Sequence, residues 1–150
     1  MRKQDIALSL AAVPAVVVLI SSCAPTAKNV AHGNLTVRCA ETLSGQDVTG
    51  GGVSGTGRCM LTGVLHDSGP ATDYRTQNGQ EVLIRRVVAG AKGTITFVIT
   101  IPLANGSREP WTIRSGTKTY TDLRGRGFQV VDNFTGTPAT FVLTGTVSQV

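Results

Sequence analysis

Residues 94–103 read Thr-Ile-Thr-Phe-Val-Ile-Thr-Ile-Pro-Leu, with an apolar side chain at every second position. Such a two-residue period is typical of a β-strand that turns one face toward an apolar core. Residues 80–88 are also rich in Val, Leu and Ile, and the connecting segment 89–93 contains two glycines. The two segments therefore predict an antiparallel pair of strands. One face of the second strand consists of Ile95, Phe97, Ile99 and Ile101.

Short segments of the same kind continue in both directions along the chain, separated by Gly, Asn, Asp, Ser and Thr. No segment sustains the 3.6-residue apolar period of a helix. Seven or eight short strands favour an all-β antiparallel barrel or sandwich, and closure into a barrel would remove exposed strand edges. Residues 45–57 are rich in glycine and predict a loop with a short strand near Val48, and residues 66–70 and 105–107 predict turns. The further strands are expected at residues 34–39, 59–65, 111–115, 127–133 and 139–147.

The first 22 residues predict a signal peptide. Met1-Arg2-Lys3 is basic, and residues 6–20 are almost entirely apolar. This run is shorter than the roughly 20 residues that span a membrane. Its basic start and small-residue end are typical of an export signal that is later removed.

The segment Ile20-Ser21-Ser22-Cys23 resembles a bacterial lipobox. The resemblance implies that the thiol of Cys23 receives a lipid and becomes the mature N-terminus. The alternative is an ordinary signal peptide cut near Ser22 or Ala24. Lipidation predicts a lipoprotein anchored to the extracytoplasmic face of the cell membrane, because several acyl chains hold a protein firmly there. Residues 23–33 are then expected to form a flexible tether, and residues 34–150 one domain.

Basic residues outnumber acidic ones, with 14 Lys and Arg against 9 Asp and Glu and a net charge of +5. The longest basic run in the expected domain is Arg85-Arg86, and aromatic residues are few. Nucleic-acid binders usually cluster basic residues on one face with aromatic residues that stack on bases. We therefore expect no nucleic-acid partner, and the membrane is the partner that the lipobox implies.

Cys39 and Cys59 are the other two cysteines. Two cysteines in one small exported domain most often pair, and closing a loop of about twenty residues contributes roughly 3 kcal/mol in the chain-entropy model. The competing hypothesis is a metal site with His66. It lacks the close cysteine or histidine spacing of zinc sites. We expect a disulfide, with no metal and no cofactor.

Residues 111–127 read Trp-Thr-Ile-Arg-Ser-Gly-Thr-Lys-Thr-Tyr-Thr-Asp-Leu-Arg-Gly-Arg-Gly, a strand, a turn and a second strand. This segment resembles the C-terminal signature of dirigent and allene oxide cyclase-like proteins, in which Gly-Thr-Gly-x-Phe/Tyr precedes Arg-Gly. The resemblance implies a calycin-like, eight-stranded antiparallel barrel around an apolar cavity. Lys118 replaces the usual second glycine. We expect Tyr120 to plug one end of the barrel and Arg124 to bond carbonyls across it. Gly116, Gly125 and Gly127 can take positive φ angles without a Cβ penalty.

Arg85 and Arg86 interrupt the two faces of the strand at residues 80–88. One of them must point inward, where its charge must be paired or hydrogen-bonded. Asp132 and Glu81 are the candidate partners. A structural ion pair and a ligand-binding group inside the cavity both fit this pattern. The ligand-binding hypothesis expects Arg86→Leu to weaken binding without unfolding. The expected ligand-binding set is Arg86, Phe97, Trp111, Tyr120 and Asp132.

The sequence contains no nucleophile motif such as Gly-x-Ser-x-Gly, and it identifies no catalytic residue. His66-Asp67 is a candidate polar pair at a rim, or an exposed turn. We expect a non-enzymatic barrel that binds a small apolar ligand or an unidentified envelope partner. The alternative is a cyclase or isomerase that shapes a reactive substrate by confinement.

Overall fold

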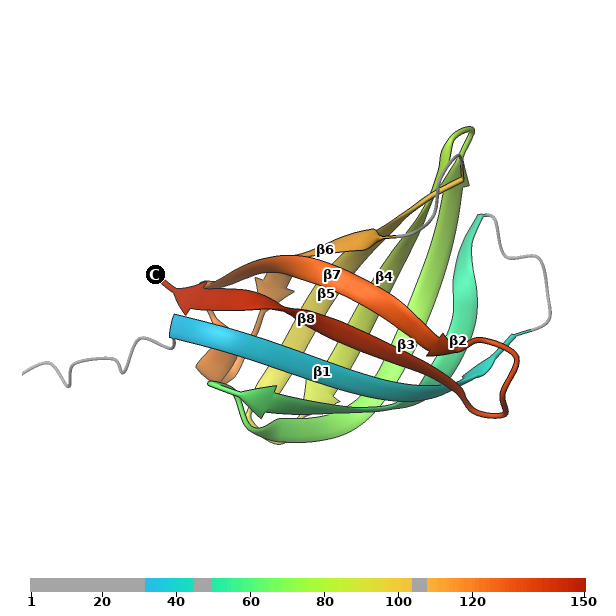
Figure 1. The fold of residues 1–150 in the computed structure, drawn as a ribbon. Coiled ribbons are helices and arrows are strands. Elements are labelled where there is room, and N and C mark those ends of the chain that lie inside the picture. Colours follow the sequence, from blue (N-terminus) through green and yellow to red (C-terminus); the bar gives the residue numbers. More distant parts are fainter. Residues whose placement is uncertain (1–31, 45–49, 104–107) are drawn as a thin grey trace, which may run out of the picture.

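A computed structural model describes residues 32–44, 50–103 and 108–150, and its eight strands close into an antiparallel barrel (Figure 1). Each strand pairs with the next, and β1 also pairs with β8, which closes the barrel. The predicted all-β barrel is therefore confirmed. The strands are β1 (His32–Leu43), β2 (Gly50–Gly63), β3 (Asp67–Asn78), β4 (Glu81–Gly90), β5 (Gly93–Pro102), β6 (Glu109–Gly116), β7 (Leu123–Asn133) and β8 (Ala139–Gln149), and a 3₁₀ helix, η1 (Lys118–Tyr120), precedes β7.

Alternation along the strands builds the core. In β5, Ile95, Phe97 and Ile99 are at most 1 % exposed, whereas Thr96 and Val98 between them are partly exposed. The same alternation in β8 buries Phe141 and Leu143. Full burial of one such side chain stabilises the fold by about 1.5–3 kcal/mol. The inward faces of the strands therefore form a continuous core inside the barrel.

Two sequence predictions about strands were wrong. Residues 66–70 were expected to be a turn, but β3 begins at Asp67. The glycine-rich segment 45–57 was expected to be a loop, but β2 begins at Gly50. The first half of β2 and all of β3 were missed because their inward positions include Gly55 in β2 and Ala71 and Asp73 in β3, which give no apolar alternation. These segments are strands because they pair with the neighbouring strands of the barrel.

The beginning of the chain lies outside the described residues. This part of the chain contains the predicted signal peptide, Cys23 and most of the predicted tether. Val48 and residues 105–107 also lie outside the described residues. β1 begins at His32, so it includes the last two residues of the segment 23–33. Within the described ranges, the structure has no helix long and apolar enough to cross a membrane.

The predicted disulfide between Cys39 and Cys59 is confirmed. The two residues lie directly opposite each other on β1 and β2, and their Cα atoms are 4.1 Å apart. Both side chains point into the core, where they are at most 3 % exposed. The bond therefore links the first two strands from inside the barrel.

Tyr120 closes one end of the barrel, as the sequence predicts. Its ring is 2 % exposed, and its hydroxyl donates a 2.8 Å hydrogen bond to Asp67 Oδ2. Burial and this bond raise the pKa of Tyr120 above its usual value. Desolvation acts to raise the pKa of Asp67, but the bonds from Tyr120 and from three backbone N–H groups hold it below its usual value. Asp67 is therefore a structural link at this closed end.

The turn before β7 departs from the expected backbone geometry. Gly116, Gly125 and Gly127 do not use their freedom to take positive φ angles. Lys118 does take one, with φ 54°, at the position where the related signature has glycine. Gly127 serves close packing instead, because a Cβ there would lie 2.0 Å from the carbonyl oxygen of Thr144. The motif thus shapes the contact between β7 and β8.

Candidate functional site

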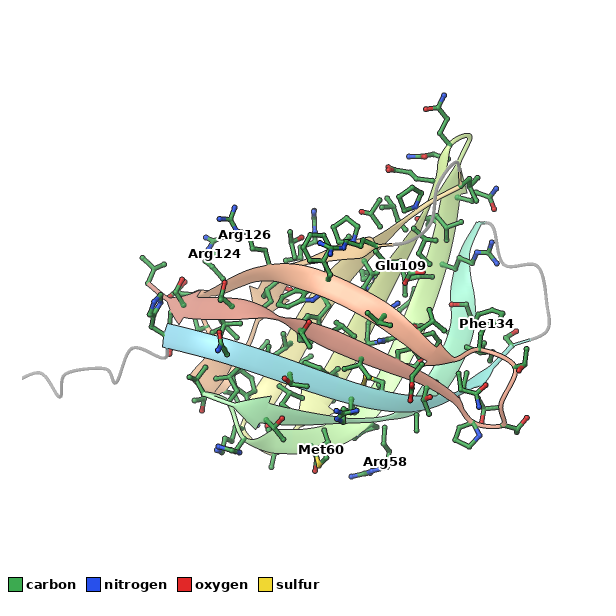
Figure 2. All side chains as sticks on the ribbon, viewed as in Figure 1. Arg58, Met60, Glu109, Arg124, Arg126 and Phe134 are labelled. Atoms are coloured by element: carbon green, nitrogen blue, oxygen red, sulfur yellow. A yellow bond between two sulfur atoms is a disulfide. The ribbon has the colours of Figure 1, made fainter. Side chains whose placement is uncertain are left out.

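A cavity of about 450 Å³ opens at the end of the barrel opposite Tyr120. It runs from Leu103 and Phe134, which are 53 % and 65 % exposed, to Arg86, which is 1 % exposed. Figure 2 shows Phe134 on the connection between β7 and β8, at the rim of this open end. The lining is mainly apolar and consists of Leu43, Ser44, Ser54, Asp73, Arg75, Val82, Ile84, Arg86, Ile101, Leu103, Glu109, Gln129, Val131, Phe134 and Phe141.

Arg86 forms the polar floor of the cavity. As predicted, it shares the inward face of β4 with Val82 and Val88, whereas Arg85 points outward. Its Nε and Nη2 donate bonds of 2.8 and 2.7 Å to the two carboxylate oxygens of Asp73. This bidentate geometry is the strongest form of an arginine–carboxylate pair.

Two further contacts complete the surroundings of the guanidinium. Nη1 donates a 2.9 Å bond to Gln129 Oε1, and Glu41 Oε1 lies 2.9 Å from Nε. The ring of Phe141 lies 4.9 Å from the guanidinium carbon and covers one face of it. Burial alone would lower the pKa of Arg86, but Asp73 and Glu41 raise it above its usual value. Arg86 is therefore held as a cation by the protein itself.

Glu41 is the least compensated charge in this network. It is fully buried, and the Nε hydrogen of Arg86 is already donated to Asp73, so neither carboxyl oxygen of Glu41 accepts a hydrogen bond. Burial raises the pKa of Glu41 to about 8; Arg86 acts against this shift, and the negative charge of Asp73 adds to it. Burial beside Asp73 therefore favours the protonated form of Glu41.

The network continues from Gln129 toward the open end. Gln129 Nε2 donates a 2.6 Å bond to Glu109 Oε2, and Figure 2 shows Glu109 near the wide end of the barrel. Arg75 also lines the cavity, and its buried Nε–H has no hydrogen-bond partner among the described residues. An unpaired buried donor carries a desolvation penalty of about 1–3 kcal/mol. The Nη2 of the same guanidinium donates a 3.4 Å bond to Gln77 Oε1.

The structure separates the predicted ligand-binding set. Of the five residues, only Arg86 lines the cavity. Phe97 and Trp111 lie in the closed core, where their rings meet edge to face with centroids 5.5 Å apart. Tyr120 closes the opposite end. Asp132 is exposed and accepts a 3.4 Å bond from Thr140.

The predicted partners of Arg86 were wrong. Asp132 shares an outward face of β7 with Phe128 and Val130, which are 45 % and 61 % exposed, whereas Gln129 points inward. Glu81 instead accepts a bond from Asn78 at the tip of the β3–β4 hairpin. The prediction took Phe128 and Val130 to mark the inward face of β7. These apolar side chains point outward instead.

Two other expectations also differ from the structure. Arg124 is exposed on the outer face of β7, so it does not bond carbonyls across the barrel. Cys39, Cys59 and Glu41 lie close enough to suggest metal ligands. The two sulfur atoms form a disulfide, however, so they are not the thiolates that a metal site requires. His66 is exposed and is not in this group.

Sequence reasoning missed Glu41, Asp73 and Gln129. For Glu41 a signal was present, because the alternation Leu35, Val37, Cys39 extends to residue 41 and places it inward. Asp73 belongs to the strand that was not predicted, and only the register of β3 against β4 places it opposite Arg86. Gln129 was missed because the sequence does not show which face of β7 points inward.

Comparison with known proteins supports the fold. No model of a known protein family matches the chain, and no curated protein matches it. Among solved structures, the barrel is similar to the pterocarpan synthase dirigent protein GePTS1, with a TM-score of 0.57 and 14 % sequence identity. The match covers 89 % of this chain and 99 % of that one. The chain therefore has a dirigent-like barrel.

Proposed function

We propose that the barrel binds one small, uncharged and largely apolar molecule in its open cavity, without catalysis. The observation that carries this proposal is a cavity of about 450 Å³ with an apolar wall and a buried polar floor. Ligand sites in proteins typically enclose about 300–1,000 Å³ and combine an apolar lining with a few fixed polar groups. The dirigent-like fold agrees with such a role.

The charges around the cavity favour an uncharged ligand. Arg86 is already occupied by Asp73 and Gln129, so it offers little to an anionic group. Among the described lining residues, the two basic side chains, Arg75 and Arg86, are matched by two acidic ones, Asp73 and Glu109. The ligand class is therefore an uncharged and largely apolar molecule.

Filling the cavity tests this proposal. Ile84 lines the cavity wall, and Ile84→Trp would place an indole ring in the ligand volume. We expect the affinity for the neutral fluorescent probe N-phenyl-1-naphthylamine to fall at least tenfold, which corresponds to about 1.4 kcal/mol. The measurement is a fluorescence titration of the full chain in detergent.

The matched control is Leu83→Trp. Leu83 is adjacent to Ile84 but points to the other face of β4, so this variant has the same aromatic addition outside the cavity. The control is expected to bind the probe like the unmodified protein. Equal probe binding by Ile84→Trp and the unmodified protein, with both folded, would rule out the cavity as the binding site.

We further propose that the protein is a lipoprotein anchored through Cys23 on the extracytoplasmic face of the cell membrane. The support is the basic start, the apolar run and the lipobox-like Ile20–Cys23 segment. In a bacterial host, Cys23→Ala is expected to remove incorporation of an alkyne-labelled palmitate and to release most of the barrel from the membrane fraction. Unchanged labelling of the Cys23→Ala variant would contradict the anchor.

For the cyclase or isomerase alternative, the candidate proton-transfer groups among the described residues are the carboxyl groups of Glu41, Asp73 and Glu109. Glu41 has a pKa near neutrality, but it lies behind Arg86 and does not line the cavity. Asp73 does line it, but both of its carboxylate oxygens accept bonds from Arg86. Glu109 also lines the cavity and accepts a bond from Gln129 through Oε2, so it is the residue on which this alternative would depend.

A further inference from the structure

A second groove, of about 370 Å³, lies on the outside of the barrel near its closed end. It crosses β6, β7, β8 and the first residue of β1. Arg124 and Arg126 line it together, and Figure 2 shows both side chains extending from β7 away from the barrel. This groove is separate from the internal cavity, with which it shares no lining residue.

The strand register brings the lining of this outer groove together. Arg124 and Arg126 are two residues apart and therefore point to the same, outer face of β7. Arg124 lies opposite Ser148, and Arg126 lies opposite Thr146, on β8. On the other side of β8, His32 of β1 also pairs with Ser148. The fold thus places two guanidinium groups beside hydroxyl groups.

The charge of the outer groove is uncompensated. Among the described residues that line it, none is acidic. Within the same part of the chain, the structure gives neither Arg124 nor Arg126 an ion pair or a side-chain hydrogen bond. Arg114, also exposed, lies two residues beyond Thr112, which lines the groove. Planar guanidinium groups bind phosphate with two parallel hydrogen bonds, and hydroxyl groups can add further bonds.

We propose that the outer groove binds the phosphate groups of anionic lipids and holds the closed end of the barrel against the membrane. The choice of a lipid as the source of the phosphate rests on the proposed anchor at Cys23. β1 begins at His32, a residue of the groove and nine positions after Cys23. Nine extended residues reach at most about 30 Å. The anchor would therefore keep the groove close to the lipid surface.

This arrangement has a consequence for the internal cavity. The start of β1 and the end of β8 lie side by side at the closed end (Figure 1). The cavity opens at the opposite end, near Phe134. With the groove on the lipid surface, the mouth of the cavity lies at the other end of the barrel from the lipid contact.

The test measures lipid retention by the full, anchored chain in detergent, using native mass spectrometry with phosphatidylglycerol or phosphatidylcholine. The unmodified protein is expected to retain phosphatidylglycerol preferentially. A basic residue near an anionic surface contributes about fivefold in affinity, so Arg124→Gln/Arg126→Gln is expected to weaken retention about 25-fold. Raising the salt from 0.15 to 0.5 M should weaken retention by the unmodified protein, because the contact is electrostatic.

The charge-matched control is Arg38→Gln/Arg58→Gln. Both residues are exposed on β1 and β2, and Figure 2 shows Arg58 on a different face from Arg124 and Arg126. The control should retain phosphatidylglycerol like the unmodified protein. An equal loss in the control would show an effect of net charge alone and would overturn the proposal.

Two further outcomes would also overturn it. Equal retention of phosphatidylglycerol and phosphatidylcholine would show that the groove does not select the anionic lipid. Competition by millimolar inorganic phosphate as effective as that by phosphatidylglycerol would make the groove a site for free anions. Ile84→Trp separates this proposal from the cavity proposal, because it should abolish probe binding and leave lipid retention intact. Loss of lipid in that variant would place the lipid inside the barrel and contradict the outer groove.

Discussion

Replacing Arg86 with methionine lowers the free energy of unfolding by about 3–5 kcal/mol, the range measured when one partner of a buried ion pair is removed. The substitution leaves Asp73 and Glu41 buried without a cation, and it leaves Gln129 Oε1 without its donor. Domains of this kind are stable by about 5–15 kcal/mol, so the loss is a large fraction of the total. Urea unfolding at pH 7, followed by Trp111 fluorescence, measures it.

Two control variants separate the network from simple loss of an arginine. Arg85→Met removes the outward neighbour, which stacks on Tyr74 at 4.2 Å, and should change stability by less than about 1 kcal/mol. The triple variant Glu41→Leu/Asp73→Leu/Arg86→Met replaces the whole network and should recover most of the loss, because apolar replacement of a buried ion group is often neutral. A stable Arg86→Met with weakened probe binding would instead support the ligand-binding role inferred from sequence.

Glu41→Gln makes the barrel more stable at pH 8 and leaves its stability unchanged near pH 4.5. The folded-state pKa of Glu41 is raised from 4.5 to about 8, so the folded protein holds a proton there that the unfolded chain releases. The stabilisation by this proton is complete below pH 4.5 and is lost as the pH rises toward 8, by about 1.4 kcal/mol per pH unit. Glutamine mimics the protonated side chain at every pH.

The measurement is the melting temperature of the unmodified protein and of Glu41→Gln between pH 4.5 and 8.5. The difference between the two curves isolates Glu41, because Asp73, Glu109 and all other titrating groups are present in both. Glu81→Gln is the control, since Glu81 is only partly buried at the tip of a hairpin. Parallel curves for Glu41→Gln and the unmodified protein would show that Glu41 is ionised in the folded state.

Most of the barrel is predictable from the sequence because most strands alternate apolar and small polar residues. β5 and β8 show this directly, and the cysteines of β1 and β2 pair as expected. The prediction failed for β3 and the first half of β2. Their inward residues are Gly, Ala, Ser or Asp, because they line the cavity or pack closely against β1, and such residues carry no two-residue apolar period.

The candidate site was predictable only in its central residue. A strand with arginine at two successive positions must turn one of them inward, and that reasoning identified Arg86. Its partners come from β1, β3 and β7, and their sequence distances from Arg86 carry no information about contact. Phe97 and Trp111 were assigned to the ligand because the sequence does not say where along the barrel the core ends and the cavity begins.

The sequence by itself determined the all-β architecture, the disulfide between Cys39 and Cys59, the inward direction of one of Arg85 and Arg86, and the closing position of Tyr120. Each follows from local alternation, from the tendency of two cysteines in one small domain to pair, or from a short motif. Only the tertiary structure decided which carboxylates surround Arg86, which end of the barrel is open and where Arg124 and Arg126 converge on hydroxyl groups. These features depend on the register between strands, which is determined by closure of all eight strands together.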